Sequence, residues 1–313
     1  MKIHFIFNPK SGRNARRPWL APHIRDFIAA RGLDAVFLTT EGPGHATELA
    51  RDAVRAGAER VIAVGGDGTM NEVAQALLFT PAALGLVPCG SGNGLALHLG
   101  IPTDPRRSLV LATGERTPVA AIDTGLVNGR PFFNAMGTGF DAEISRRFNR
   151  LARRGLPAYA RTGLAAFLAR TDTPVVIRGG GQRLALPTLL VAVANSDQYG
   201  NNAVIAPGAR VDDGQLDLLA VRPVNVFTAI PLVARLFARK LDASPRVQLL
   251  RSAHFVIERP GPGLIHTDGE THETGATLEI DVRPRSLRLL VPPTARVSFA
   301  HDTAPRGFEL QLP

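Results

Sequence analysis

The residues best suited to chemistry form a glycine-rich turn with a single carboxylate, Gly65–Thr69, of sequence Gly-Gly-Asp-Gly-Thr. An apolar strand pattern precedes the turn and a helix pattern follows it. Backbone N–H groups and the positive end of a helix dipole therefore converge there, as a bound phosphate requires. Asp67 would repel a phosphate unless a cation lay between them, and Mg²⁺ is the natural candidate. We predict a Mg²⁺-phosphate site, with Asp67 exposed in the turn and Thr69 capping the helix. A turn in which Asp67 only accepts hydrogen bonds from backbone amides is the alternative.

Two other loops of small residues follow predicted strands, Asn8–Gly12 after the first strand and Gly90–Gly94 after the fourth. Loops that follow the strands of a parallel sheet lie at the same edge, so the three loops would meet in one crevice. The turn at Gly65–Thr69 does not fit the pattern G-x-G-x-x-G, and no G-x-x-x-x-G-K-[ST] occurs in the chain. The sequence therefore predicts a phosphate site of a different kind.

The order of the expected elements predicts the architecture. To about residue 120 strands alternate with helices, which is typical of a parallel, doubly wound sheet. The expected strands and helices there are Lys2–Phe7, Trp19–Arg31, Asp34–Thr39, His45–Ala56, Arg60–Val64, Met70–Leu78, Leu84–Pro88 and Gly94–Leu99. After Val119, β-branched runs and turn dipeptides predict a mostly β domain, with helices at Ala142–Arg154, Pro157–Ala169 and Val226–Ala238 and late strands at Thr277–Val282 and Ser286–Val291.

We therefore predict an α/β plus mostly-β fold. A Rossmann-like, parallel-sheet α/β domain spans residues 1–122, and a β-sandwich-like domain spans residues 123–294. Residues 295–313 are expected to return to the first domain.

Composition restricts the class of protein. The 313 residues are 45% apolar and 20% charged, which is usual for a folded globular chain. The formal net charge of +9 favours an anionic partner, although a genome-wide preference for arginine codons also explains it. Cys89 is the only cysteine, which excludes an intramolecular disulfide and fits a reducing cytosol. With no secretion signal and no run near the roughly 20 apolar residues of a membrane span, we expect a cytoplasmic protein that is peripheral at the inner face of the membrane.

Seven motifs occur in the order and at the intervals of one known family. They are Asn8–Gly12, Gly65–Thr69 with Asn71 and Glu72, Gly90–Ala96, Ile122–Arg130, Phe133–Ala142, Val211–Asp217 and Thr267–Glu270. Together they resemble the diacylglycerol kinase catalytic domain family, which includes bacterial lipid kinases and sphingosine kinases. The resemblance implies ATP and Mg²⁺ as cofactors, a lipid alcohol as phosphoryl acceptor and an active site in the cleft between the domains. It also implies no nucleic acid as partner, and it allows a homodimer.

The resemblance further implies roles for particular residues. Glu270 is expected to be the general base and Asp268 a metal-linked partner. A structural magnesium ion is expected at Asp213 and the backbone carbonyls of Arg210 and Gln215. The residues expected to contact ATP are Asn8, Pro9, Lys10, Ser11, Gly12, Thr40, Gly65, Gly66, Asp67, Gly68, Thr69 and Ser91.

Glu270 also makes chemical sense independently of the resemblance. An alcohol must lose its proton as its oxygen attacks the γ-phosphorus, and a carboxylate within hydrogen-bond reach contributes roughly 10²–10⁴-fold to the rate. A polar hairpin turn over Asp268–Glu270 is the alternative. We expect the flanking His266 and His272 to be solvent-facing strand ends without a catalytic role.

The lipid and the membrane contact stay open at this point. Asn93-Gly94 is closer to the sphingosine kinase version of its motif than to the Asn-Asp of many bacterial members, so diacylglycerol, a sphingoid base and phosphatidylglycerol are all candidates. The expected helix Ala142–Arg154 presents a basic amphipathic surface that could dock on anionic lipid. Its arginines are Arg146, Arg147, Arg150, Arg153 and Arg154.

The predicted function is ATP-dependent phosphorylation of a lipid alcohol. One alternative is a soluble kinase of the related NAD-kinase type, which also uses a Gly-Gly-Asp-Gly turn; the loops Asn8–Gly12 and Gly90–Gly94 and the presence of Glu270 argue against it. The other is a non-catalytic nucleotide- or lipid-binding regulator. The presence of both Asp67 and Glu270 argues against that reading.

Overall fold

The computed structural model describes residues 1–12, 14–149, 167 and 172–298. The N-terminal domain is built on a parallel sheet of strand order β2-β1-β3-β4. Its strands are β1 (Ile3–Phe7), β2 (Ala35–Thr39), β3 (Arg60–Gly65) and β4 (Ala83–Pro88). Every residue of β1, β3 and β4 is buried, as expected for parallel strands covered on both faces.

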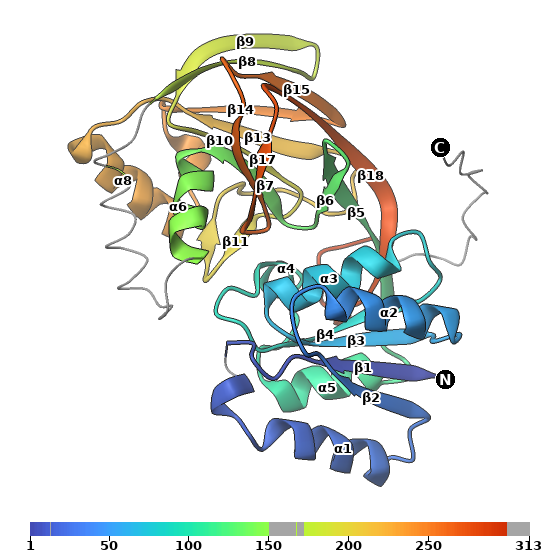
Figure 1. The fold of residues 1–313 in the computed structure, drawn as a ribbon. Helices are drawn as coiled ribbons and strands as arrows, with labels where there is room; N and C mark the ends of the chain where they lie inside the picture. The colour runs from blue at the N-terminus through green and yellow to red at the C-terminus, as the bar shows by residue number, and fades with distance from the viewer. Residues whose placement is uncertain (13, 150–166, 168–171, 299–313) are drawn as a thin grey trace.

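Helices cover both faces of this sheet (Figure 1). On one face α1 and α5 pack through Leu20, Ile24, Leu109 and Ala112; on the other face α2, α3 and α4 contribute to a larger core. The helices are α1 (Leu20–Ala30), α2 (His45–Arg55), α3 (Asp67–Leu77), α4 (Gly94–His98) and α5 (Pro105–Thr113), and a 3₁₀ turn, η1, spans Asn14–Arg16. The predicted doubly wound α/β architecture is confirmed.

For this domain, one predicted helix starts at another residue and one helix was not predicted. Helix α3 begins at Asp67, three residues before the predicted start, so Asp67 is its first residue and not part of a preceding loop. Helix α5 was not predicted, although Asp104 caps it by accepting the N–H of Arg107 at 3.0 Å and Pro105 occupies its first position. Both are ordinary helix-start signals.

The C-terminal domain is a sandwich of two sheets. One is antiparallel with the order β14-β13-β10-β7-β16-β17. The other continues the N-terminal sheet beyond β4 through β18, β15, β8 and β9, with β5 and β6 attached to β18. The strands are β5 (Val119–Val127), β6 (Arg130–Phe132), β7 (Ala135–Gly139), β8 (Thr173–Gly179), β9 (Gln182–Thr188), β10 (Leu190–Ala194), β13 (Leu216–Val221), β14 (Val247–Ser252), β15 (His254–Glu258), β16 (Gly263–Thr267), β17 (Glu270–Thr274) and β18 (Thr277–Leu290).

The sandwich core lies between these sheets. Val127, Ile177 and Phe255 of one sheet meet Val193 and Ile265 of the other. This confirms the predicted β-sandwich-like second domain. Outside the sheets lie the short ribbon β11 (Gln198–Gly200) and β12 (Ala203–Val204), helices α6 (Phe140–Asn149) and α8 (Val226–Phe237), and the 3₁₀ turn η2 (Leu241–Ala243).

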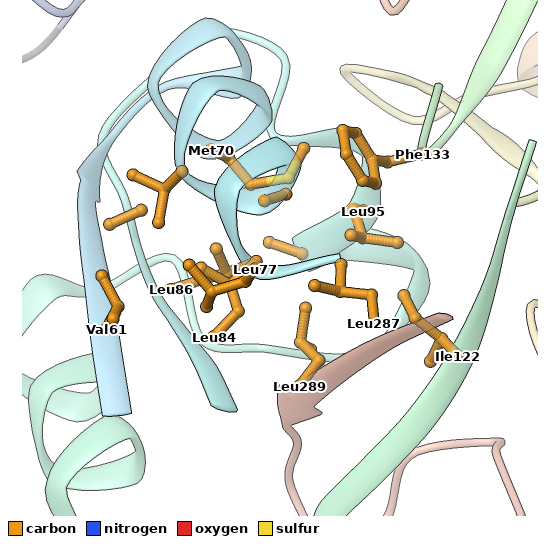
Figure 2. Close-up of a cluster of buried hydrophobic side chains, with 14 of the residues drawn as sticks. Val61, Met70, Leu77, Leu84, Leu86, Leu95, Ile122, Phe133, Leu287 and Leu289 are labelled. Carbon is orange, nitrogen blue, oxygen red and sulfur yellow. The ribbon is translucent and has the colours of Figure 1, made fainter. Parts of the chain in front are cut away.

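Strand β18 joins the two domains. The sequence predicted two strands here, but they form a single strand with a break in pairing register against β5 between Arg283 and Leu287, where Arg285 adopts a φ of +50°. The far end of β18 pairs in parallel with β4 through Leu289 and Leu84. Figure 2 shows Leu287 and Leu289 packed within the core of the N-terminal domain.

Three predictions concern the domain boundary or residues outside the described ranges. The division expected between residues 122 and 123 falls inside β5. Ala295 and Val297 pack against the core of the N-terminal domain, while residues 299–313 lie outside the described residues. Except for Phe167, the expected helix Pro157–Ala169 also lies outside them, as do Arg150, Arg153 and Arg154.

Candidate active site

Three loops meet at the carboxyl edge of the N-terminal sheet. The hydroxyl of Ser11 accepts the backbone N–H of Gly66 at 2.6 Å, and the side-chain amide of Asn8 donates to the hydroxyl of Thr69 at 2.9 Å. A Cβ atom on Gly66 would lie 2.9 Å from the Cα of Gly90, so the backbones of the second loop, Gly65–Thr69, and the third loop, Gly90–Gly94, are in contact. Only glycine permits this approach. The structure thus brings together the loops that the sequence singled out.

Asp67 is half-buried, so the prediction that it is exposed in the turn was wrong. Its Oδ1 accepts the backbone N–H of Gly94 at 2.9 Å and its Oδ2 that of Asn93 at 2.8 Å, which ties the second loop to the third. Each carboxylate oxygen has two lone pairs, so these bonds orient Asp67 and leave it able to meet a cation. Thr69 lies inside α3 and does not cap it, because its hydroxyl is the acceptor for Asn8.

The other residues expected to contact ATP surround the same edge. Thr40 is buried at the end of β2, where its backbone N–H donates to the carbonyl of Phe7 at 2.9 Å. Lys10 is exposed and its Nζ donates to the carbonyl of Glu41 at 3.3 Å, while Ser91 is exposed at the tip of the third loop.

The turn between β16 and β17 carries the candidate base. Asp268, in this turn, has a φ of +51°. Its carboxylate accepts three backbone N–H groups, from Phe133 at 2.8 Å, Asn134 at 2.7 Å and Ala135 at 3.0 Å. Burial raises the pKa of Asp268 to about 6, although these three bonds favour its charged form. Asp268 therefore holds the turn against the segment that leads into β7.

Glu270 reaches the glycine-rich turn Gly65–Thr69 of the other domain. Its Oε1 lies 3.9 Å from the position that a Cβ atom on Gly68 would occupy. Although Glu270 is exposed to solvent, the surrounding protein partly desolvates its carboxylate and raises its pKa above the ordinary value, and the negative charge of Glu72 adds to the shift. A carboxylate with a raised pKa is better matched to accepting a proton near neutral pH.

Phe133 connects these two parts of the site. Its ring is fully buried in the core of the N-terminal domain, where Figure 2 shows it beside Met70 of α3 and Leu95 of α4. Because its backbone N–H bonds to Asp268, the turn that carries Glu270 is tied to the helix that begins at Asp67.

A buried ion pair supports the same turn. The Nε2 of His266 lies 2.8 Å from Oδ2 of Asp141, which also accepts the hydroxyl of Tyr199. Burial is the largest single influence on both pKa values and opposes both charges, but the charge attraction and the hydrogen bonds together outweigh it. The attraction and these bonds raise the pKa of His266 and, with the bond from Tyr199, lower that of Asp141. When His266 is neutral, its Nδ1 accepts the backbone N–H of Gly269 at 3.3 Å.

The prediction that His266 is a solvent-facing strand end was therefore wrong, since only 4% of it is exposed. His272 is half-buried beside the hydroxyl of Thr267 at 3.1 Å. Burial lowers the pKa of His272, and the charges of Arg130 and His266 lower it further.

Sequence reasoning missed a polar segment that joins the domains after β10. The side-chain amide of Asn195 donates to the carbonyls of Asp123 and Phe133, both at 2.9 Å. Asp197 lies 2.6 Å from Nδ1 of His98 at the end of α4, and it also accepts Arg239 at 2.8 Å. The signal was present, because four consecutive polar residues directly follow a buried strand.

The residues expected to hold a structural magnesium ion lie in the turn before β13. Oδ1 of Asp213 accepts the backbone N–H of Gln215 at 3.1 Å, and its Oδ2 lies 3.6 Å from Arg251. The guanidinium of Arg210 pairs with Asp212. Within the described ranges, no group of three or more His, Cys, Asp or Glu side chains is arranged to hold a metal ion.

A cavity of about 460 Å³ lies at the opposite end of β16 from Glu270. Thr138, Arg147, Arg259 and Leu264 are among its lining residues, and it includes none of the predicted site residues.

Comparison with known proteins identifies the class. Residues 2–126 match the diacylglycerol kinase catalytic domain, and residues 134–291 match the YegS C-terminal NAD kinase beta sandwich-like domain. These matches define a lipid kinase class with a two-domain catalytic unit. Within it, the chain belongs to the YegS-like lipid kinase family, as the resemblance predicted.

Individual relatives agree with this assignment. A "probable lipid kinase YegS-like" protein of Pseudomonas fluorescens is 32% identical over 280 residues, 87% of this chain and 92% of its own. The "probable lipid kinase YegS" of Salmonella typhimurium is 31% identical over 297 residues, 92% and 95% of the two chains. A crystal structure described as a diacylglycerol kinase from Bacillus anthracis shares the fold, with a TM-score of 0.70, 21% identity and coverage of 93% and 97%. In the described part of this chain, no helix is long and apolar enough to cross a membrane.

Replacing His266 tests the buried pair. His266→Ala leaves Asp141 buried without its cation, so we expect a loss of about 3–5 kcal/mol in unfolding free energy at pH 6, measured by urea denaturation. The stabilisation from a raised histidine pKa is fully present below the ordinary value of 6.5 and is lost as pH rises through the raised value. The stabilisation from the lowered pKa of Asp141 is present above its ordinary pKa of 3.8, and it is lost as pH falls through the lowered pKa.

The difference between wild type and His266→Ala should therefore be largest at mildly acidic pH and smaller above neutrality. His272→Ala is the matched control, because His272 has no facing carboxylate among its bonded partners. An equal loss in the control, or a loss independent of pH, would count against the ion pair.

Proposed function

We propose that this chain transfers the γ-phosphoryl group of ATP to a hydroxyl of diacylglycerol or a related lipid alcohol, with Glu270 as general base and Mg²⁺-ATP at the Gly65–Thr69 turn. The observation that carries the proposal is the approach of Glu270 to Gly68, which puts a carboxylate with a raised pKa against the turn best suited to bind phosphates. The names of the relatives support a lipid acceptor.

The N-terminal loops would bind the nucleotide. The backbone of Gly65–Thr69 and the start of α3 would receive the phosphates, with Asn8–Gly12 alongside and Thr40 and Ser91 at the margins. Asp67 and the phosphate oxygens would hold the Mg²⁺, which neutralises charge on the transferring group and needs only one or two protein carboxylates. The two N–H bonds that fix Asp67 suit it to this role.

Glu270 would act on the acceptor. It removes the hydroxyl proton while the lipid oxygen forms a bond to the γ-phosphorus. The bond between that phosphorus and the β–γ bridging oxygen breaks, and ADP leaves. Positioning and charge stabilisation supply most of the rate in phosphoryl transfer. Asp268 would contribute by fixing the turn, since both its oxygens are bonded to backbone amides, and a metal-linked role would be secondary.

A structural magnesium ion at Asp213 and the carbonyls of Arg210 and Gln215 is part of the proposal. Asp123 accepts the N–H of Gly214 at 2.7 Å, so its negative charge adjoins those of Asp212 and Asp213 in the same turn. A cation there would offset the repulsion among these carboxylates.

The acceptor and the base can be tested together. The purified protein is incubated with labelled ATP and, separately, with diacylglycerol, sphingosine, phosphatidylglycerol and NAD; we expect label in a lipid and none in NAD. Glu270→Gln keeps the shape of the side chain and removes its basicity. We therefore expect unchanged ATP binding and a single-turnover rate lower by about 10²–10⁴-fold.

Glu273→Gln is the matched control, because Glu273 is exposed on the same strand β17, and its rate should stay near wild type. Label in NAD alone would favour the soluble kinase, and no label in any acceptor would favour a regulator. A near-native rate for Glu270→Gln would mean that another group is the base.

The pH profile tests the electrostatics at Glu270. A general base must be ionised, so activity should fall as pH drops through its raised pKa. Glu72→Gln removes a nearby negative charge while Gln can still accept the N–H of Ala46. The pKa of Glu270 should then move down toward its ordinary value, and the acidic limb of the kcat profile should shift to lower pH. An unshifted limb would show that burial alone sets this pKa or that the limb reports another group.

Thermal melting tests the structural ion without any activity assay. A ligand that binds only the folded protein at 100 times its Kd adds about 2.7 kcal/mol of stability. We expect Mg²⁺ to raise the Tm of the wild type, EDTA to reverse the effect, and Asp213→Asn to reduce it. Asp52→Asn, on the exposed face of α2, should respond like the wild type. Equal Mg²⁺ responses in wild type and Asp213→Asn would remove Asp213 from the site.

A further inference from the structure

Helix α8 is apolar on the side that faces solvent. It lies at the outer edge of the C-terminal domain (Figure 1), and none of its twelve residues is buried. Ala229, Leu232 and Leu236 are partly buried against the core formed by β10, β13 and their neighbours. This contact accounts for only one side of the helix.

The neighbouring side of the helix carries a stripe of large apolar residues. Val226, Ile230, Val233 and Phe237 are spaced by four, three and four positions, so they line up along the helix, with Phe227 beside them. Their exposed fractions are 45%, 65%, 54% and 50%, and that of Phe227 is 84%. Contiguous exposed apolar surface of this kind usually marks an interaction site. We call these five residues the α8 stripe.

The helix is held in this orientation by its own contacts. Asn225 and Thr228 form a capping box, in which the side chain of each accepts the backbone N–H of the other at 3.0 Å. At the other end Arg235 donates to the carbonyl of Ala243 at 2.6 Å. The stripe is thus presented on a formed helix whose ends are fixed, so a partner need not induce the helix on binding.

The charge around the stripe indicates the kind of partner. Between residues 222 and 246 the chain has five cations and one anion, a net charge of +4. The charged residues are Arg222, Arg235, Arg239, Lys240, Asp242 and Arg246. An exposed apolar helix face in a chain segment of net positive charge is complementary to an anionic lipid surface. A symmetric contact between two copies would instead bring the same cations together.

Helix α8 is also linked to the proposed active site. Arg239, two residues beyond its end, donates to Asp197 at 2.8 Å, and Asp197 lies 2.6 Å from His98. His98 ends α4, which begins directly after the loop that Asp67 binds. A surface that engages α8 is therefore connected, through two short polar contacts, to the loops at the site.

We propose that the α8 stripe docks this protein on anionic membranes, with Phe227 and Ile230 entering the boundary between headgroups and acyl chains and the cations contacting the headgroups. The proposal rests on the proposed function in that a membrane lipid is the substrate. It assigns docking to α8 because of its exposed apolar stripe. Cations paired with a carboxylate, such as Arg239 near α8 and Arg146 and Arg147 on α6, do not decide between the two helices. The docking surface predicted on Ala142–Arg154 stays a separate, untested prediction.

Vesicle co-sedimentation of the full chain without ATP tests the docking. One set of vesicles is phosphatidylcholine; in the other about a third of the lipid is phosphatidylglycerol. We expect the wild type to bind the anionic vesicles more tightly and to lose this preference at high salt. The double variant Phe227→Ser/Ile230→Ser should bind them at least about tenfold more weakly, because insertion depends on apolar area. Its thermal melt should match the wild type, since both side chains are exposed.

Phe79→Ser is the matched control, because Phe79 is also a highly exposed phenylalanine, at 70%, and lies in the N-terminal domain. It should bind vesicles like the wild type. Equal vesicle binding by the double variant and the wild type would overturn the proposal, and so would the absence of wild-type binding to both vesicles. A double variant that changes the oligomeric state in sedimentation velocity without changing vesicle binding would show that the stripe joins two copies, which also overturns it.

The assay separates this proposal from the proposed function. Vesicle binding that depends on the α8 stripe supports docking even if no lipid becomes labelled, in which case the proposed function fails alone. If lipid dispersed in detergent micelles is labelled but vesicle binding is independent of the stripe, the docking proposal fails alone.

Discussion

The site depends on one carboxylate that accepts three backbone N–H groups. Asp268 is about 133 residues away in sequence from Phe133, Asn134 and Ala135, yet it bonds to all three. A carboxylate without these partners would be costly to bury. Phe133 also anchors in the N-terminal core, beside Met70 of α3 (Figure 2). The bonds to Asp268 therefore fix the position of the β16–β17 turn relative to α3. Glu270 faces the glycine-rich turn Gly65–Thr69 as a consequence of this arrangement.

A second carboxylate has a similar role among the loops of the N-terminal domain. Asp67 joins the turn Gly65–Thr69 to the loop Gly90–Gly94 by accepting two backbone N–H groups. In the same way, Asp268 joins the start of β7 to the turn that carries Glu270. Each aspartate uses its oxygens to fix backbone that the sheets alone leave free. The glycines of these loops then allow the close approach, since a Cβ on Gly92 would lie 2.7 Å from Oδ2 of Asp67. Polar contacts therefore fix the loops relative to one another, while the buried ring of Phe133 anchors the turn that carries Glu270 to the N-terminal core.

Much of the fold could be predicted from the sequence, because it is encoded locally. Buried strands, the glycine-rich turns and the change of texture after Val119 are visible within short windows. The bonds of Asp67 and Asp268 span 26 or more residues and leave no local pattern, so their structural roles were missed. The burial of His266 was missed for the same reason, since its partner Asp141 is 125 residues away. Strand β18 was divided in two because the break at Arg285 looks like a turn in sequence, whereas pairing with β5 on both sides keeps it one strand.

The positively charged residues differ in where they lie and in what they contact. Arg60 is buried and donates to the carbonyls of Ala112 and Gly114, and Arg259 donates to the backbone around Gly263 and Thr274. These arginines act as structural donors, and their charge faces protein oxygen atoms. The segment around α8, by contrast, has a net charge of +4 out of the total of +9 and has most of its cations exposed. A preference for arginine codons would spread charge evenly over the surface. Codon preference does not explain why +4 of the net charge of +9 lies in the segment around α8. Among the described helices, α8 is the one that has no buried residue, although it carries large apolar residues.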